Sequence, residues 1–123
     1  PFDGCYERYA SATALVKMVS AVDPSLTNGR QIFANLERPE IKAVVNKWID
    51  EIVLGLATLI HIFNPSCVVL GGGIMVQPYI LEQIHARIPQ MVMSSFAHVQ
   101  ISSAELGNSA GLLGAYYLAS QKL

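Results

Sequence analysis

Three consecutive glycines, Gly71, Gly72 and Gly73, are the residues whose type and spacing most directly suggest a binding site. They follow the run Cys67–Leu70, which is apolar and rich in β-branched residues and therefore predicts a buried strand. A helical pattern resumes at about Pro78. Because glycine lacks a Cβ, its N–H groups can approach a ligand closely, and strand–glycine loop–helix units commonly hold nucleotides. A tight turn would give the same letters, so both interpretations stay open here.

Two better-known glycine motifs do not fit this loop. The Rossmann pattern requires a further glycine three residues after Gly73, where the chain has Val76. A P-loop requires Gly-Lys-Ser/Thr, but Ile74 and Met75 follow the glycines. The sequence therefore favours neither a Rossmann dinucleotide site nor a P-loop.

The elements that must position these glycines alternate between helices and strands. Apolar spacing predicts helices over about 7–22, 29–37, 39–63, 78–93 and 109–121, and strands over about 67–70 and 99–103. Thr27 or Asn28 can cap the second helix, and Asn64-Pro65 ends the third. This order predicts an α/β layer with at least two parallel strands. Since sheets usually have about four to six strands, we expect upstream strands to complete it.

The expected helix 39–63 has the clearest apolar pattern. Its stripe is Ile41, Val45, Trp48, Ile52, Leu56, Leu59 and Phe63. The second half is apolar nearly all round, which predicts burial on several sides or a subunit contact. Gly55 costs about 1 kcal/mol relative to alanine there and can permit close approach of a neighbouring element. The expected stripe of the first helix is Tyr9, Ala12, Leu15, Val16 and Val19.

Composition excludes several classes of protein. The 123 residues are 52% hydrophobic and 14% charged, which indicates one globular domain or part of one. A net charge of −1 without a basic stripe argues against nucleic-acid binding by this segment. The longest apolar stretch, 52–63, is too short to cross a bilayer, and we find no signal peptide. Two distant cysteines favour a reduced, cytoplasmic protein, with Cys67 as a small core residue.

Three segments in order resemble the C-terminal part of the ROK family of sugar kinases and repressors. Gly4-Cys5-Tyr6-Glu7 is similar to the end of the family motif Cys-x-Cys-Gly-x-x-Gly-Cys-x-Glu. The run 63–74 resembles its asparagine-proline, strand and triple-glycine block, and 106–115 resembles its closing helix. The resemblance implies an actin-like, hexokinase-like ATPase fold on a ribonuclease-H-like sheet. Because the chain opens at Pro1 without an initiator methionine, we expect residues 1–123 to be part of the second lobe, cut inside that motif.

The resemblance also implies binding roles. Glu7 matches the glutamate that binds sugar hydroxyls, although a carboxylate favoured by a helix N-terminus would look the same. Gly71, Gly72 and Gly73 match the segment against the adenosine and neighbouring phosphate of ATP. Gly107 and Asn108, at the start of the closing helix, are candidate contacts of the nucleotide, although a structural role, with Asn108 as an N-cap, is favoured over a direct contact. Gly111 and Gly114 are expected to pack closely on the sheet.

The chemistry of phosphoryl transfer is incomplete in this segment. The resemblance places the family's catalytic aspartate and phosphate loops, which act with ATP and Mg²⁺, upstream of Pro1. We therefore assign no catalytic residue and expect no kinase activity from this segment alone. Cys5 matches the last cysteine of the family's zinc site. Structural zinc needs four ligands, and His61, His85 and His98 show no ligand spacing. We therefore assign no metal to this segment, although the parent can bind zinc.

The leading hypothesis is a kinase that transfers the γ-phosphoryl of ATP to a hexose or an N-acylhexosamine. The alternative is a sugar-sensing repressor with an upstream helix-turn-helix, in which Glu7 would bind the inducer. A homodimer is expected in either case, because family members commonly dimerise and because the apolar half of the long helix and the Tyr116-Tyr117 pair suit a subunit interface.

Overall fold

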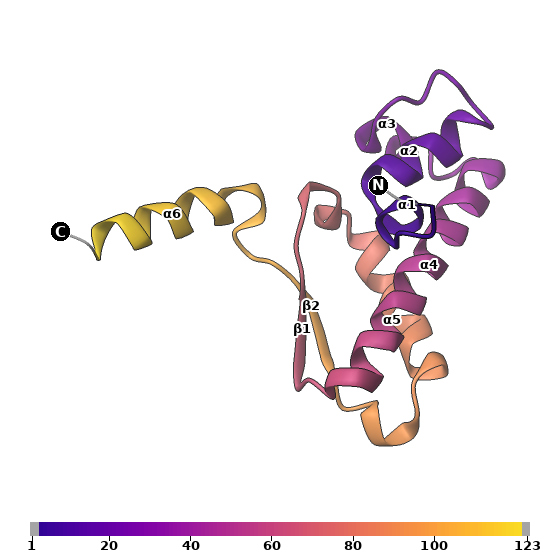
Figure 1. Ribbon diagram of the computed structural model, residues 1–123. Coiled ribbons are helices and arrows are strands. Elements are labelled where there is room, and N and C mark those ends of the chain that lie inside the picture. Colours follow the sequence, from indigo (N-terminus) through magenta and orange to yellow (C-terminus); the bar gives the residue numbers. More distant parts are fainter. Residues whose placement is uncertain (1–2, 122–123) are drawn as a thin grey trace.

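Helix α4 (Pro39–Phe63) is the element on which most of the others pack, as Figure 1 shows. The computed structural model describes residues 3–121, without the side chain of Asn108. The remaining helices are α1 (Glu7–Ala10), α2 (Ala12–Ser20), α3 (Gly29–Ala34), α5 (Pro78–Met91) and α6 (Ala110–Ser120), with 3₁₀ turns η1 (Gly73–Val76), η2 (Ser94–Phe96) and η3 (Gly107–Ser109). The strands are β1 (Cys67–Leu70) and β2 (Gln100–Ser103). The predicted order of helices and strands is confirmed.

Helix α4 begins and ends where the sequence predicts. Pro39 occupies its first turn, where a missing N–H costs nothing. Asn64 ends it in the left-handed region, with φ 42°, and donates its N–H to the Ile60 carbonyl at 2.8 Å. The buried positions of α4 are Ile41, Val45, Trp48, Ile49, Ile52, Val53, Leu56, Ala57 and Ile60. Helices α1, α2 and α5 lie against this helix.

The predicted stripe of α4 is wrong in its last two turns. Leu59 and Phe63 are exposed, and Ile60 is buried instead. A period of 3.6 residues brings Ile60, four after Leu56, back onto the buried face. The exposed apolar residues of this half are Leu54, Leu59, Ile62 and Phe63.

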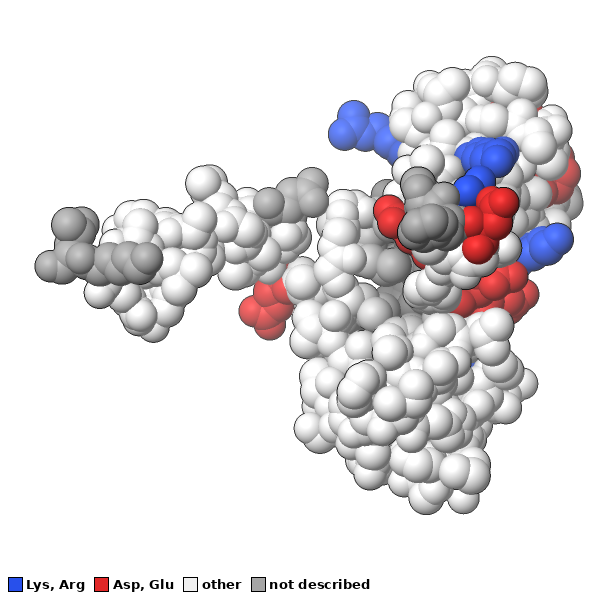
Figure 2. All heavy atoms as spheres, viewed as in Figure 1, with Lys and Arg blue, Asp and Glu red and all other residues white. Residues whose placement is uncertain are grey.

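On the face shown in Figure 2, charged side chains gather around the end formed by α1–α3, and the opposite end of the body is nearly uncharged.

The single helix predicted over residues 7–22 is instead two helices, α1 and α2. Ser11 between them is extended, with φ −76° and ψ 162°, and its Oγ accepts a hydrogen bond from the Ala14 N–H at 3.1 Å. Serine is a favoured N-cap because its oxygen satisfies an otherwise unpaired N–H of the new helix. The break changes the direction of the chain, so Tyr9 and Ala12 are exposed.

Helix α3 starts as predicted, with Asn28 rather than Thr27 as its cap. The Asn28 Oδ1 accepts a hydrogen bond from the Gln31 N–H at 3.0 Å. The helix ends at Ala34, three residues earlier than expected. Helix α5 and both strands lie within two residues of their predicted bounds.

The two strands pair in parallel, as predicted, with Cys67 opposite Gln100 and Leu70 opposite Ser103. The chain crosses from β1 to β2 through α5, and the helical body lies on one side of the strands (Figure 1). Val68 and Leu70 pack against the core on that side. The prediction that Cys67 is buried is wrong: with Val69 it points to the other face of β1, which no described helix covers.

Helix α6 extends away from the body, as Figure 1 shows, and mainly contacts η3. None of its residues is buried, and Leu112 is 76% exposed. The prediction that Gly111 and Gly114 pack closely on the sheet is therefore wrong, since nothing lies within 4 Å of a Cβ added at either position. No helix in the described part of the chain is long and apolar enough to cross a membrane.

Candidate functional site

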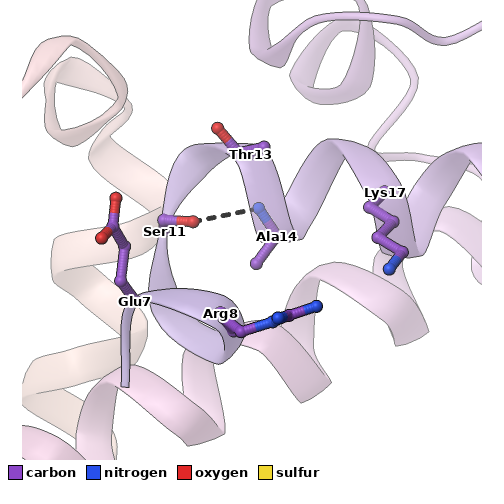
Figure 3. A pocket seen from close by; sticks show the side chains of 6 residues that line it. All are labelled: Glu7, Arg8, Ser11, Thr13, Ala14 and Lys17. Atoms are coloured by element: carbon purple, nitrogen blue, oxygen red, sulfur yellow. Dashed lines mark hydrogen bonds between the residues drawn. The ribbon is translucent and has the colours of Figure 1, made fainter. Parts of the chain in front are cut away.

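Glu7, the first residue of α1, lines an open hollow of about 300 Å³. The hollow is also lined by Arg8, Ser11, Thr13, Ala14 and Lys17. Figure 3 shows the Glu7 carboxylate and the Arg8 guanidinium pointing in different directions. Within residues 3–121, no hydrogen bond or ion pair engages this exposed carboxylate. Both of its oxygens can therefore accept hydrogen bonds from a polyhydroxylated ligand.

The simpler explanation of Glu7, a carboxylate that stabilises a helix N-terminus, has little support here. Helix α1 has four residues, and a single turn carries only a small dipole. Arg8 pairs with Asp3 at 3.0 Å rather than with Glu7. Glu7 therefore has no structural partner that explains its presence at this place.

The glycine loop after β1 combines a strained turn with an open backbone. Gly72 has φ 109°, a conformation that side chains rarely adopt, so a turn by itself requires glycine at this position. A Cβ added at Gly71 or Gly72 would nevertheless meet nothing within 4 Å. The backbone of the loop thus faces open space, as a loop that holds a nucleotide must. The η1 turn follows at once, and helix α5 begins at Pro78, as predicted.

Gly107 lies beside the glycine loop, although the two are far apart in the sequence. Gly72 and Gly107 line one small cavity of about 60 Å³, at the carboxyl ends of β1 and β2. Ligands of open α/β sheets bind at this edge. Gly107 has φ 49° and starts η3. The backbone of Asn108 lies in η3, its side chain is outside the described residues, and the N-cap position of α6 is taken by Ser109 rather than by Asn108.

A second hollow reaches the glycine loop. The second has a volume of about 340 Å³ and is lined by Ala12, Gly29, Arg30, Gly73, Ile74, Val76 and Gln77. Ser11 lines the first hollow and its neighbour Ala12 lines the second. The N-terminus of α2 thus separates the carboxylate of Glu7 from the backbone of Gly73.

Sequence reasoning missed Arg30 and Ser11 as neighbours of the candidate site. Arg30 contributes a cation to the hollow that contains Gly73, and a cation suits a phosphate group. Its position in the sequence, in the first turn of a short helix, gives no sign of this. Ser11 forms the break that separates α1 from α2, so it sets the direction in which α1 presents Glu7.

The residues present do not fit a structural zinc site. Cys5 is half-buried, and the described residues contain no group of three or more His, Cys, Asp or Glu side chains that could hold a metal. Each histidine instead contacts a backbone carbonyl within 2.7–3.0 Å: His61 with Ala57, His85 with Ile101 and His98 with Ser95. A tetrahedral zinc site needs four ligands, so Cys5 alone cannot form one.

The aspartates of the chain are engaged elsewhere. Each pairs with an arginine: Asp3 with Arg8 at 3.0 Å, Asp23 with Arg38 at 2.7 Å, and Asp50 with Arg87 at 2.7 Å. None of them lines the hollow of Glu7 or that of Gly73. The candidate site therefore has groups that can bind a polyol and a nucleotide, but no aspartate that could accept a proton from a hydroxyl.

The chain is similar to known sugar kinases in both sequence and structure. The chain is 29% identical to an N-acetyl-D-glucosamine kinase of Yersinia enterocolitica over 94% of its own length and 39% of that protein. It is 36% identical to a β-glucoside kinase of Listeria innocua over 72% of its length and 30% of that protein. The crystal structure of a ROK family glucokinase from Streptomyces griseus, in complex with glucose and AMPPNP, superimposes with a TM-score of 0.83 at 27% identity.

These similarities cover most of this chain but less than half of each relative. The superposition on the Streptomyces glucokinase covers 98% of this chain and 46% of that protein. The α/β arrangement of helices on a parallel pair of strands is thus the fold of part of a ROK kinase. The ROK family model matches residues 1–122. The chain therefore belongs to the ROK family.

Proposed function

We propose that this chain is part of the second lobe of an ATP-dependent sugar kinase, which transfers the γ-phosphoryl of ATP to a hydroxyl of a hexose or an N-acylhexosamine. The observation that carries the proposal is that consecutive residues at the start of α2 line the two hollows, Ser11 that of Glu7 and Ala12 that of Gly73. A carboxylate that has no partner among the described residues lines one hollow, and Gly73 of the glycine loop lines the other. Phosphoryl transfer requires a sugar and a nucleotide to be held in such proximity.

Glu7 would bind the sugar and orient it. An ionised carboxylate accepts hydrogen bonds from two hydroxyl groups, which fixes the orientation of a ring. The backbone of Gly71, Gly72 and Gly73, with Gly107 and Asn108 on the other strand end, would lie against the adenosine and a phosphate of ATP. Mg²⁺ would arrive with ATP and neutralise charge on its phosphates.

We also propose that the 123-residue chain has no kinase activity by itself. Transfer requires a group that accepts the proton of the attacking hydroxyl. The three aspartates of the chain each pair with an arginine and line neither hollow, which supports a catalytic aspartate in the other lobe. Sugar-dependent turnover by the purified segment would refute this proposal.

The test of the function is an ADP-release assay on the full-length protein with Mg-ATP. The sugars are glucose, fructose, mannose, N-acetylglucosamine and N-acetylmannosamine, because kinases similar to this chain are named for glucose-type and N-acetylated sugars. Glu7→Gln removes the charge and replaces one acceptor by a donor. Charge-assisted hydrogen bonds contribute about 1.5–3 kcal/mol, so we expect the KM for sugar to rise at least about tenfold with an unchanged KM for ATP.

The matched control is Glu82→Gln, an exposed glutamate on α5 that lines neither hollow. It should leave both KM values unchanged. Turnover with one sugar, weakened by Glu7→Gln but not by the control, would support the kinase and name its substrate. No turnover, together with sugar binding that Glu7→Ala weakens, would replace the kinase by the repressor alternative.

A homodimer remains part of the proposal. The exposed apolar residues of the second half of α4, Leu54, Leu59, Ile62 and Phe63, support a subunit contact there. Sedimentation of the full-length protein at micromolar concentration should show a dimer, and Ile62→Glu should shift it toward the monomer. A wild-type protein that sediments as a monomer would contradict the proposal.

A further inference from the structure

Tyr6 and Gly55 form a contact that joins the start of α1 to the middle of α4. The Tyr6 hydroxyl donates to the backbone carbonyls of Glu51 and Ile52, each at 3.2 Å. Helical carbonyls retain a second lone pair and can accept such an additional bond. Burial raises the pKa of the Tyr6 phenol, and the Glu51 carboxylate raises it further. The phenol therefore stays protonated and able to donate at neutral pH.

Only glycine leaves room for this ring. A Cβ added at Gly55 would lie 2.6 Å from Tyr6 Cε2 and closer still to Cζ and Oη, whereas real Cβ atoms essentially never approach within 3.0 Å. Gly111 and Gly114, the glycines inside α6, have nothing within 4 Å of an added Cβ. The expectation that Gly55 permits close approach of a neighbouring element is thus confirmed, and the element is Tyr6.

The contact determines where α1 lies. Helix α1 has four residues and buries none of them, so apolar packing of its own does little to hold it. Tyr6 is its N-cap residue, and Glu7 follows directly. At the other end, Trp48 Nε1 donates to the Ser11 carbonyl at 3.0 Å. Helix α4 therefore holds α1 at both ends.

We propose that Gly55 is a positioning residue for the sugar-binding site, which acts through the Tyr6 ring to fix α1 and with it the Glu7 carboxylate. This inference rests on the proposed role of Glu7. Gly55 itself lines neither the hollow of Glu7 nor that of Gly73, so it would not touch a ligand in either of them. Its contribution would be the position of Glu7, which directly follows the tyrosine whose ring Gly55 accommodates.

The test uses Gly55→Ala in the full-length protein. The added methyl must displace the ring, and the first residue to move with it is Glu7. Misplacing a binding group by about 1 Å can cost on the order of 100-fold, so we expect kcat/KM for the sugar to fall about 10- to 100-fold, mainly through KM, with an unchanged KM for ATP. Thr58→Ala is the control, because Thr58 lines the same surface hollow of α4 as Tyr6 and Gly55, and the change to alanine does not fill the space of the ring.

A double mutant separates the contact with the ring from a general effect on α4. Once Tyr6→Ala has removed the ring, Gly55→Ala has nothing to displace. The double variant should therefore match Tyr6→Ala alone. A Gly55→Ala effect of equal size with and without the ring would overturn the inference, and so would a wild-type sugar KM in Gly55→Ala.

Hydrogen exchange distinguishes failure of this inference from failure of the proposed function. The N–H groups of Tyr9 and Ala10 donate to the Tyr6 carbonyl at 3.0 and 3.1 Å. Gly55→Ala should accelerate exchange at these two amides more than at Leu15, which donates to Ser11. If exchange accelerates in a protein that binds no sugar, Gly55 does position α1 and the proposed sugar site is wrong. Unchanged exchange would overturn the inference whatever the kinetics.

Discussion

Replacing Trp48 by phenylalanine tests whether α4 holds the break between α1 and α2. The Trp48 ring is fully buried, and its Nε1–H donates to the Ser11 carbonyl at 3.0 Å. This carbonyl also accepts a hydrogen bond from the Leu15 N–H at 3.1 Å, so it keeps one partner in the variant. The lost hydrogen bond should therefore cost about 1 kcal/mol rather than the larger penalty of an unpaired buried group.

The missing ring atoms add to this loss. Trp48→Phe removes about 40 Å³, and at about 24 cal/mol per Å³ the remaining cavity costs about 1 kcal/mol. The lost transfer free energy of the removed atoms adds up to about 1 kcal/mol. We expect a total of about 2–3 kcal/mol, or at least about a 30-fold larger opening constant for the amides of α4.

Native-state hydrogen exchange of the full-length protein measures this opening. Fluorescence cannot follow it, because Trp48 is the only tryptophan in the sequence. Ile52→Val, which removes one buried methylene from the same helix, provides the reference at about 0.5–1.5 kcal/mol. If Trp48→Phe costs no more than Ile52→Val, the hydrogen bond to Ser11 contributes nothing and the reasoning is refuted.

Three further predictions concern backbone and charge. Gly72→Ala, at φ 109°, should strain the loop by about 1–2 kcal/mol and raise the KM for ATP but not for sugar; equal effects on both would contradict a local role. Asn64 lies at φ 42°, so Asn64→Ala should lower the free energy of unfolding, measured by urea denaturation, by about 1 kcal/mol, whereas Asn64→Gly should not lower it. Hydrogen bonds from Ser25 and Arg38 lower the pKa of Asp23 from 3.8 to about 2. The ionised form of Asp23 therefore stabilises the fold above pH 4, and this stabilisation is lost as the pH falls through 2. Asp23→Asn should lower the thermal midpoint at pH 7, whereas near pH 2 the midpoints of the variant and the wild type should match.

Local patterns predicted the type and order of the elements well. The bounds of α4 follow from Pro39 and from Asn64-Pro65, whose effects on the backbone depend on no distant residue. Burial was harder to predict. Cys67 lies in a strand as expected, but whether its face is covered depends on which elements pack there. An apolar run alone does not distinguish a strand covered on one face from a strand covered on both.

The break at Ser11 shows why the candidate site could be predicted only in part. Ser11 fits the middle of a helical pattern, although its Oγ caps α2 by accepting from the Ala14 N–H. Its second contact, in which Trp48 donates to its carbonyl, comes from 37 residues later in the chain and could not be predicted from the local pattern. The glycines could be identified from their type and spacing. Their position relative to Glu7 could not, because it depends on the direction of α2 relative to η1.

In this proposal, the position of Glu7 depends on α4 more than on the motif that contains it. Tyr6 bonds to carbonyls 45 and 46 residues away, and Trp48 bonds to the residue just after α1. Both contacts are to the body of one long, well-packed helix, whose opening should be rare compared with that of a four-residue helix. If α4 sets the geometry, substitutions at Tyr6, Gly55 and Trp48 should all change sugar affinity while leaving ATP affinity intact, although none of the three lines the hollow of Glu7. If the motif alone sets it, Trp48→Phe would lower stability without changing the sugar KM, and measuring both quantities on that one variant decides between the two accounts.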